Sequence, residues 1–433
     1  MSEHHTDVPT VNWLGSRLSV QVGPVAHGGH CVARHEGRVI FVRHALPGER
    51  AVVEVTEDNS GSFCRADAVE ILEAAPERVT APCSYAHPGG CGGCDFQHVA
   101  IEAQRTLKAQ VIAEQFQRLA GIEVSVDVQP LEPSGLGWRR RIRYAVAADG
   151  TLGLRVHRSH EVLPISACPI GAPGVGDATA LSRRWPGQDE VEVSVDDAGE
   201  VATVAYRTAP ERPRAGQRGS RQRGRGRSRP VLVETSVQGP GSLGYTAGGR
   251  SFEVTAGGFW QTHPAAAQAF TDAVLAGVQP RAGDRVLDLY AGAGLFTAVL
   301  ADAVSGGGRV LGLEADRAAV ADAHRNLAGT EWVSVQAAGV TAESVAAAAD
   351  SLGGVEAVVL DPPRTGAGRA VIEAILALQP RVVCYVACDP AALARDVATA
   401  RQLGWEMAEL KAFDAFPMTH HVECVATLRP AAP

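Results

Sequence analysis

Short apolar runs alternate with segments of helical spacing from residue 285 to the end of the chain. The runs are Val286 to Tyr290, Val310 to Glu314, Trp332 to Gln336, Val355 to Asp361 and Val382 to Ala387. Because each run is apolar at consecutive positions, both faces of each strand should be buried, as in a parallel sheet covered by helices. We therefore predict a doubly wound, Rossmann-like α/β domain over residues 256–433, with a late strand at His421 to Leu428, where the pattern alternates.

The first part of the chain carries a different pattern, in which short stretches are separated by Gly, Pro and Asn. Strands are predicted at Ser19 to Val22, Val39 to Arg43, Ala51 to Thr56 and Ala66 to Glu70. Residues 11–73 thus fit a small β-barrel, a fold that often binds oligonucleotides but can also be a packing module. Helical spacing follows from Val99 to Ala120, and Gly121 should end that helix.

Residues 74–255 mix strands and turns with this helix, which indicates an α+β central domain. The net charge of −8 is unevenly distributed, because Arg207 to Arg229 contains nine arginines and a single acid. Residues 208–230 have the composition of a disordered loop. Arginine enrichment alone says little about phosphate binding here, since all but two of the 40 basic residues are arginine.

A glycine loop follows the first predicted strand of the C-terminal domain. It reads Asp288-Leu-Tyr-Ala-Gly-Ala-Gly-Leu-Phe296, and its glycines would let the backbone turn tightly and approach a ligand. Glu314 ends the second strand, where an acid commonly accepts hydrogen bonds from ribose hydroxyls. The loop lacks the ending of a phosphate cradle. The pattern indicates an adenosine-containing cofactor without phosphates, and the alternative is a tight turn beside a surface glutamate.

Two further chemical groups stand at the carboxyl ends of predicted strands, where ligands bind in such sheets. Asp361 opens the sequence Asp-Pro-Pro-Arg364 after the fourth strand, and Cys388 follows the fifth. Cys384 lies inside that strand and should be a core residue. Glu423, in His-His-Val-Glu-Cys, is either a functional acid or a solvated carboxylate on the last strand.

Together these segments resemble the bacterial family of RNA 5-methyluridine methyltransferases over nearly the whole chain. Gly28 to Gly37 through Leu46-Pro-Gly-Glu49 is similar to the RNA-binding TRAM barrel, which the resemblance places at residues 11–73. The matching motifs imply contacts to S-adenosylmethionine from Gln261 in Phe-Trp-Gln-Thr262 and from Tyr290, Glu314 and Asp361. The family often has Cys and Asn where this chain has Ala291 and Leu295.

The resemblance also implies the catalytic pair. Cys388-Asp-Pro-Ala matches the family's nucleophile motif, and His421-Val-Glu-Cys424 matches its general-base motif. Carbon 5 of uracil is a poor nucleophile, and a thiolate that adds at carbon 6 makes carbon 5 reactive. Glu423 would then remove the proton from carbon 5, with His421 as a weaker alternative.

Nine cysteines without a secretion signal argue for reduced thiols rather than a disulfide framework. Cys83, Cys91 and Cys94, together with Cys168 before Pro169, resemble the four-cysteine [4Fe-4S] site of this family. Spacing alone also suits tetrahedral zinc. Cys31 and Cys64 should be packing residues of the barrel.

The expected partner is RNA, and large-subunit rRNA is favoured over tRNA because the barrel and cysteine site together resemble the large-subunit rRNA enzymes of the family more than its tRNA enzymes. Trp138-Arg-Arg-Arg-Ile-Arg143 could contact phosphates and splayed bases, or could be a solvated strand face. The Arg/Gly run could attract RNA or be an inert insertion. Methylation of tRNA uridine or of RNA cytosine, and a noncatalytic metal-containing RNA-binding protein, remain alternatives. We expect a cytoplasmic monomer without a membrane segment.

Overall fold

A computed structural model of the protein describes residues 11–209 and 231–432. Its N-terminal part is a closed five-stranded barrel in the order β1-β2-β3-β5-β4. The strands are β1 (Arg17–Ala26), β2 (His30–His35), β3 (Arg38–Arg43), β4 (Arg50–Glu57) and β5 (Phe63–Glu73). Alternate residues such as Val20, Val22 and Ile40 point into the barrel and are buried with Cys31 and Cys64. The predicted barrel is therefore confirmed, although β2 was not predicted.

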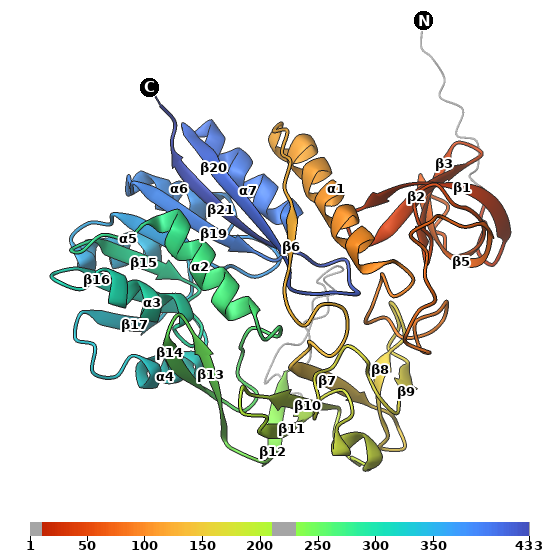
Figure 1. The fold of residues 1–433 in the computed structure, drawn as a ribbon, viewed down its shortest axis with the longest axis horizontal. Helices are drawn as coiled ribbons and strands as arrows, with labels where there is room; N and C mark the ends of the chain where they lie inside the picture. Colours follow the sequence, from red (N-terminus) through yellow and green to blue (C-terminus); the bar gives the residue numbers. More distant parts are fainter. Residues whose placement is uncertain (1–10, 210–230, 433) are drawn as a thin grey trace, which may run out of the picture.

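Helix α1 (Ile101–Ala120) connects the barrel to the rest of the molecule. It ends at Gly121, as predicted, because that residue adopts φ of 62°, a left-handed conformation that glycine tolerates. Its buried residues serve two cores. Leu107 and Val111 pack with the barrel, whereas Ile112 and Phe116 pack with the large sheet described below. The helix consequently lies between the two (Figure 1).

The middle of the chain forms a six-stranded sheet in the order β12-β11-β10-β7-β8-β9. The strands are β7 (Arg141–Val146), β8 (Leu152–Arg155), β9 (Val162–Pro164), β10 (Glu190–Val195), β11 (Val201–Thr208) and β12 (Leu232–Gln238), with a short 3-10 helix η1 (Thr179–Ser182) before β10. A separate hairpin follows, β13 (Ser242–Ala247) with β14 (Arg250–Thr255). The predicted disordered loop at 208–230 lies, from residue 210 onward, outside the described residues.

The C-terminal part is an eight-stranded sheet in the order β17-β16-β15-β18-β19-β21-β20-β6. The strands are β15 (Arg285–Leu289), β16 (Arg309–Glu314), β17 (Val333–Ala337), β18 (Ala357–Leu360), β19 (Val382–Ala387), β20 (Trp405–Asp414) and β21 (Glu423–Pro430), and β6 (Val128–Pro130). The helices are α2 (Ala266–Val278), α3 (Leu295–Ala303), α4 (Arg317–Asn326), α5 (Ala342–Leu352), α6 (Arg369–Ala377) and α7 (Pro390–Gln402).

The five strands β15 to β19 are parallel and carry apolar cores on both faces, as the sequence predicted. β21 runs antiparallel to both β19 and β20, and β6 adds the far edge in parallel with β20. β6 therefore joins the C-terminal sheet although its residues fall in the predicted central domain, 74–255. The predicted domain boundaries at residues 73 and 255 stay a prediction. Within the described ranges, no helix is long and apolar enough to cross a membrane.

Candidate active site

A cavity of about 970 Å³ opens at the carboxyl ends of the parallel strands. The loops after β15, β16, β18 and β19 meet there, because parallel strands end at one edge of a sheet. The cavity is lined by all six residues that the sequence assigned to catalysis or cofactor binding, namely Gln261, Tyr290, Glu314, Asp361, Cys388 and Glu423. The sequence prediction therefore gathered residues that lie together in the fold.

The glycine loop after β15 turns sharply into α3. Tyr290 has φ of 64°, which is unusual for a residue with a side chain, and Gly294 has φ of 90° at the helix N-cap. Glu314 holds the loop from β16, because its carboxylate accepts hydrogen bonds from the Gly292 amide at 3.0 Å and the Asp316 amide at 2.7 Å. The acid therefore orders the loop in addition to facing the cavity.

Asp288 lies beneath this loop and is fully buried. Thr297 donates its hydroxyl to one carboxyl oxygen of Asp288, and the other oxygen has no partner among the described residues. Burial raises the pKa of Asp288 to about 7. Burial also raises the pKa of Asp361 to about 7, and the neighbouring Asp288 adds to this shift. Both carboxyls, Asp361 in the lining of the cavity and Asp288 below the loop, are therefore harder to ionise than an ordinary aspartate.

Cys388 lies directly after β19, where the chain turns into α7. Asp389 is the N-cap of that helix, and its carboxylate accepts a hydrogen bond from the Ala392 amide at 2.8 Å. Burial raises the pKa of the Cys388 thiol to about 12, and the carboxyls of Glu423 and Asp361 add to the shift, whereas Arg364 opposes it. In the free protein Cys388 is therefore a thiol at neutral pH. Cys384, inside β19, is fully buried as predicted.

Glu423 opens β21, beside the end of β19. The strands pair antiparallel, and their last pair is Ala387 opposite Cys424, so Cys388 and Glu423 are the neighbouring residues at that end of the ladder. Glu423 is 5 % exposed, and its Oε2 atom has no hydrogen-bond partner within the described part of the chain. Burial raises the pKa of Glu423 well above its usual value, and Asp361 adds to this effect. The buried carboxyl and the thiol line the same cavity, close enough for Glu423 to raise the pKa of Cys388.

Arg364 and His421 form a contact that the sequence did not reveal. Pro362 and Pro363 precede Arg364, whose guanidinium donates to Nε2 of His421 at 3.0 Å. Burial lowers the pKa of His421 to about 3, so the ring is neutral and accepts this hydrogen bond. His421 lies in the loop before β21 rather than on the strand, which starts at Glu423. Because Nε2, the nitrogen of the neutral ring that could accept a proton, already accepts the hydrogen bond from Arg364, His421 is a poor candidate for the base.

Four residues of the arginine-rich segment 138–143 line the cavity, namely Trp138, Arg139, Arg141 and Arg143. Arg141 and Arg143 both pair with Glu192, at 2.8 and 2.7 Å. Trp138 is 1 % exposed and stacks on His263, so it serves packing and is not available to a base. The segment therefore presents arginines that are partly neutralised beside the cavity, with no exposed aromatic at position 138.

The four predicted cluster ligands line a second cavity, of about 420 Å³, formed by Cys83, Cys91, Cys94 and Cys168 with their neighbours. Gly93 and Arg139 border both cavities. Among residues 11–209 and 231–432, no group of three or more Cys, His, Asp or Glu side chains is close enough to hold a metal ion. The iron–sulfur assignment stays a prediction.

Comparisons with known proteins agree with this architecture. Residues 13–69 match the TRAM domain family, and residues 249–430 match the family described as tRNA (Uracil-5-)-methyltransferase. A protein of Streptomyces avermitilis called an uncharacterized RNA methyltransferase is 47 % identical, covering 97 % of this chain and 99 % of its own length. The 23S rRNA (uracil(1939)-C(5))-methyltransferase RlmD of Shewanella piezotolerans is 30 % identical, covering 95 % and 96 %.

Among solved structures, the Pyrococcus abyssi tRNA (uracil-54, C5)-methyltransferase in complex with S-adenosyl-L-homocysteine superposes with a TM-score of 0.68. It is 22 % identical and covers 94 % of this chain and 99 % of its own, a similarity that concerns the fold. The identity to full-length relatives and the two matched domains lead to one conclusion. The chain belongs to the family of RNA (uracil-5-)-methyltransferases, enzymes that take the methyl group from S-adenosylmethionine.

Proposed function

We propose that the enzyme methylates carbon 5 of a uridine in large-subunit rRNA, with Cys388 as the nucleophile and Glu423 as the base. One observation carries this proposal. Cys388 and Glu423 adjoin the last pair of the β19–β21 ladder, Ala387 with Cys424, and both line the cavity that also contains the glycine loop. Two adjacent strands of one sheet would hold a nucleophile and a base at a fixed separation.

In the proposed reaction the Cys388 thiolate adds to carbon 6 of the uracil, and the electrons of the carbon 5–carbon 6 bond move to the carbonyl oxygen. Carbon 5 then forms a bond to the methyl group of S-adenosylmethionine, whose bond from sulfur to methyl breaks so that S-adenosylhomocysteine leaves. When bound, S-adenosylmethionine would bring a positive charge into the cavity. Glu423 then removes the proton from carbon 5. The bond between Sγ and carbon 6 breaks, the ring double bond returns, and Cys388 leaves as the thiolate.

The charges of the site explain when these groups become reactive. At rest, burial keeps Glu423 protonated and Cys388 in its thiol form. A cation in the cavity favours the ionised carboxyls and the thiolate, because opposite charges stabilise each other strongly where water is excluded. Arg364 acts in the same direction, and His421 holds its guanidinium in place. We infer that Cys388 does not attack the uracil ring until S-adenosylmethionine is bound.

Substitution of Cys388 tests the nucleophile. Cys388→Ala should lower methylation by at least about 10⁴-fold while S-adenosylmethionine still binds, since the thiol acts only on the base. Cys384→Ala is the matched control, because that thiol lies in the core of the same strand. With 5-fluorouridine at the target the wild type should form a stable covalent adduct on Cys388. An adduct on another cysteine would overturn the assignment.

Glu423→Gln tests the base separately. The variant retains the shape of the side chain but cannot take a proton from carbon 5, so a methylated RNA–protein adduct should accumulate with ordinary uridine. The adduct would be detected as a slow band in denaturing gels and mapped by peptide mass spectrometry. Rapid turnover by Glu423→Gln without any adduct would show that another group removes the proton.

The choice of rRNA rests on sequence similarity over the full length. The relative that is 30 % identical over 95 % of this chain is named for uridine in 23S rRNA, whereas the tRNA enzyme is similar in fold. Mapping of 5-methyluridine in rRNA and tRNA from a strain lacking the gene decides between them. Loss of the base from tRNA, or loss of 5-methylcytidine, would replace this proposal with a tRNA or a cytosine enzyme.

We also propose that the four thiols bind an iron–sulfur cluster that holds the 83–94 segment against the region around Cys168. The four cysteines line one cavity, although among the described residues no three of them lie close enough to hold a metal ion, so the cluster would have to draw them together. Burial raises the pKa of the Cys94 thiol to about 12, and a bound cation would stabilise its thiolate. Anaerobically purified protein should contain iron and sulfide near four each per chain. Stoichiometric zinc without iron would contradict the cluster.

A further inference from the structure

The turn between β1 and β2 of the barrel touches both catalytic segments. At one end of the turn, Nε2 of His27 lies 3.0 Å from the carboxylate of Asp389, which directly follows Cys388. At the other end, Gly29 lies against His420, three residues before Glu423. These contacts join residues more than 300 positions apart in the sequence.

The Gly29 contact leaves no free space. A Cβ atom at this position would lie 2.8 Å from Cβ of His420, closer than real Cβ atoms come to their neighbours, and 3.1 Å from Cβ of Asp95, which is a tight contact. Gly29 also has φ of 77°, and its amide donates to the carbonyl of Ala26 to close the turn. The backbone of the barrel at Gly29 therefore packs directly against His420, in the loop that precedes Glu423.

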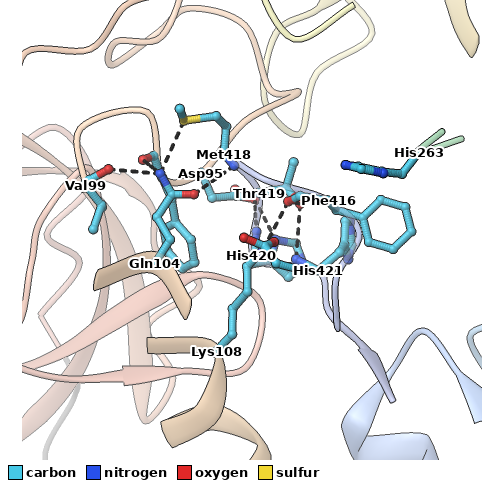
Figure 2. Close-up of polar contacts among 12 residues, drawn as sticks. Asp95, Val99, Gln104, Lys108, His263, Phe416, Met418, Thr419, His420 and His421 are labelled. Atoms are coloured by element: carbon cyan, nitrogen blue, oxygen red, sulfur yellow. Dashed lines mark hydrogen bonds and ion pairs between the residues drawn. The ribbon is translucent and has the colours of Figure 1, made fainter. Parts of the chain in front are cut away.

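The segment around Asp95 also holds that loop through hydrogen bonds (Figure 2). Asp95 Oδ2 lies 2.6 Å from Nδ1 of His420 and accepts from the His420 amide at 3.2 Å. The amides of Asp95 and Phe96 both donate to the carbonyl of Met418. His420 and Asp95 thus form a bonded pair that both lie against Gly29 of the barrel turn, and the His420 ring lies against that of His421. The barrel turn completes the support of this loop.

Asp389 links the turn to the nucleophile in a similar way. One carboxyl oxygen caps α7 through the Ala392 amide, and the other contacts His27. The position of Asp389 fixes where β19 ends and α7 begins, and Cys388 is the residue at that junction. A contact on Asp389 therefore acts on the backbone that carries the thiol.

We propose that His27 and Gly29 of the barrel are positioning residues for the chemical step. By seating on Asp389 and His420, they hold the segments of Cys388 and Glu423 in register, so the barrel takes part in catalysis in addition to binding RNA. The inference rests on the proposed roles of Cys388 and Glu423. Displacement of catalytic groups by about 1 Å can lower a rate by about 100-fold, which sets the size of the expected effect.

The chain offers a matched pair of variants. Gly28 and Gly29 both have positive φ, but a Cβ at Gly28 would meet only the ring of His30 in its own turn, at 3.5 Å. Gly29→Ala should lower kcat by about 10- to 100-fold, with KM for RNA and Kd for S-adenosylmethionine within about twofold of wild type. Gly28→Ala strains the same turn but places no atom against the His420 loop, so its kcat should remain close to that of the wild type.

His27 provides a second test that does not depend on how Gly29→Ala folds. His27→Ala should lower kcat, and His27→Gln should restore it, because the glutamine amide can donate to Asp389 from a similar position. If kcat does not fall, or if only KM for RNA rises, the turn serves RNA binding alone and the inference is wrong. The 5-fluorouridine adduct separates the two proposals. An adduct on a residue other than Cys388 overturns the proposed function, whereas normal kcat with the adduct on Cys388 overturns only the positioning role.

Discussion

Lys108 is one of two lysines in the chain, and its side chain is completely buried in α1. Its ammonium group lies 2.5 Å from Asp414 and donates to the carbonyl of Phe416 at 3.1 Å. Lys108→Met would fill a similar volume but leave the Asp414 carboxylate buried without its partner. Breaking a buried pair from one side costs about 3–5 kcal/mol. For a cooperative unit of about 200 residues this corresponds to a melting temperature lower by about 9–15 °C.

The assay is differential scanning calorimetry of three variants. Lys411→Met is the control, because Lys411 contacts Glu409 at 3.4 Å near the surface and such pairs contribute about 1 kcal/mol or less. The double variant Lys108→Met/Asp414→Leu removes both charges and should recover most of the lost stability. A melting temperature for Lys108→Met within about 2 °C of wild type would refute this reasoning, as would a double variant no more stable than the single one.

Three further predictions follow from buried polar groups. Burial lowers the pKa of His30 and His98 to about 4, so these rings stay neutral in the fold and take up protons on unfolding. Because each histidine takes up a proton in the unfolded chain, each should lower the free energy of unfolding by about 1.4 kcal/mol at pH 5.5 relative to pH 7.5. An unchanged melting temperature over that range would contradict this prediction. Burial raises the pKa of Asp361 to about 7, and the neighbouring Asp288 adds to this shift. Because the bound cation of S-adenosylmethionine favours the ionised form of Asp361, its affinity should rise by up to about tenfold per pH unit from pH 6 toward pH 7. Isothermal titration of Asp361→Asn should show a shallower slope. Tyr385→Phe removes a buried hydroxyl that donates to Asp396 at 2.7 Å, and urea unfolding should show a loss of about 1–3 kcal/mol.

The sequence predicted the strands whose hydrophobic pattern is strong. The five parallel strands are buried on both faces, and such runs are apolar without interruption. β20 was not predicted, because its burial follows no regular period, with exposed and half-buried residues from Glu406 to Lys411 and three buried residues at its end. β6 has only three residues, too few to show a period. Such strands form because neighbouring strands and helices provide hydrogen bonds and packing contacts, and the local sequence pattern gives no information about these.

The same distinction applies to the site. Asp361 and Cys388 could be proposed because each directly follows an apolar run, and strand ends meet in this fold. Glu423 opens the last strand and was proposed because its motif resembles the general-base motif of the family. The hydrogen bond from Arg364 to His421 and the contact from His27 to Asp389 join distant segments, and nothing in either segment marks its partner. Gly29 looks like an ordinary turn glycine in the sequence, and only the fold shows that it faces His420.

The edge strand β6 limits how the molecule can be divided. It pairs with β20 in the catalytic sheet, and α1, which precedes it, covers the same sheet with Ile112 and Phe116. A fragment that begins at residue 249, where the methyltransferase match starts, would lack both elements. It would expose an unpaired strand edge and an apolar face, a combination that promotes aggregation. Exchange of catalytic modules between relatives should therefore carry residues 101–130 along, although they lie more than a hundred positions upstream.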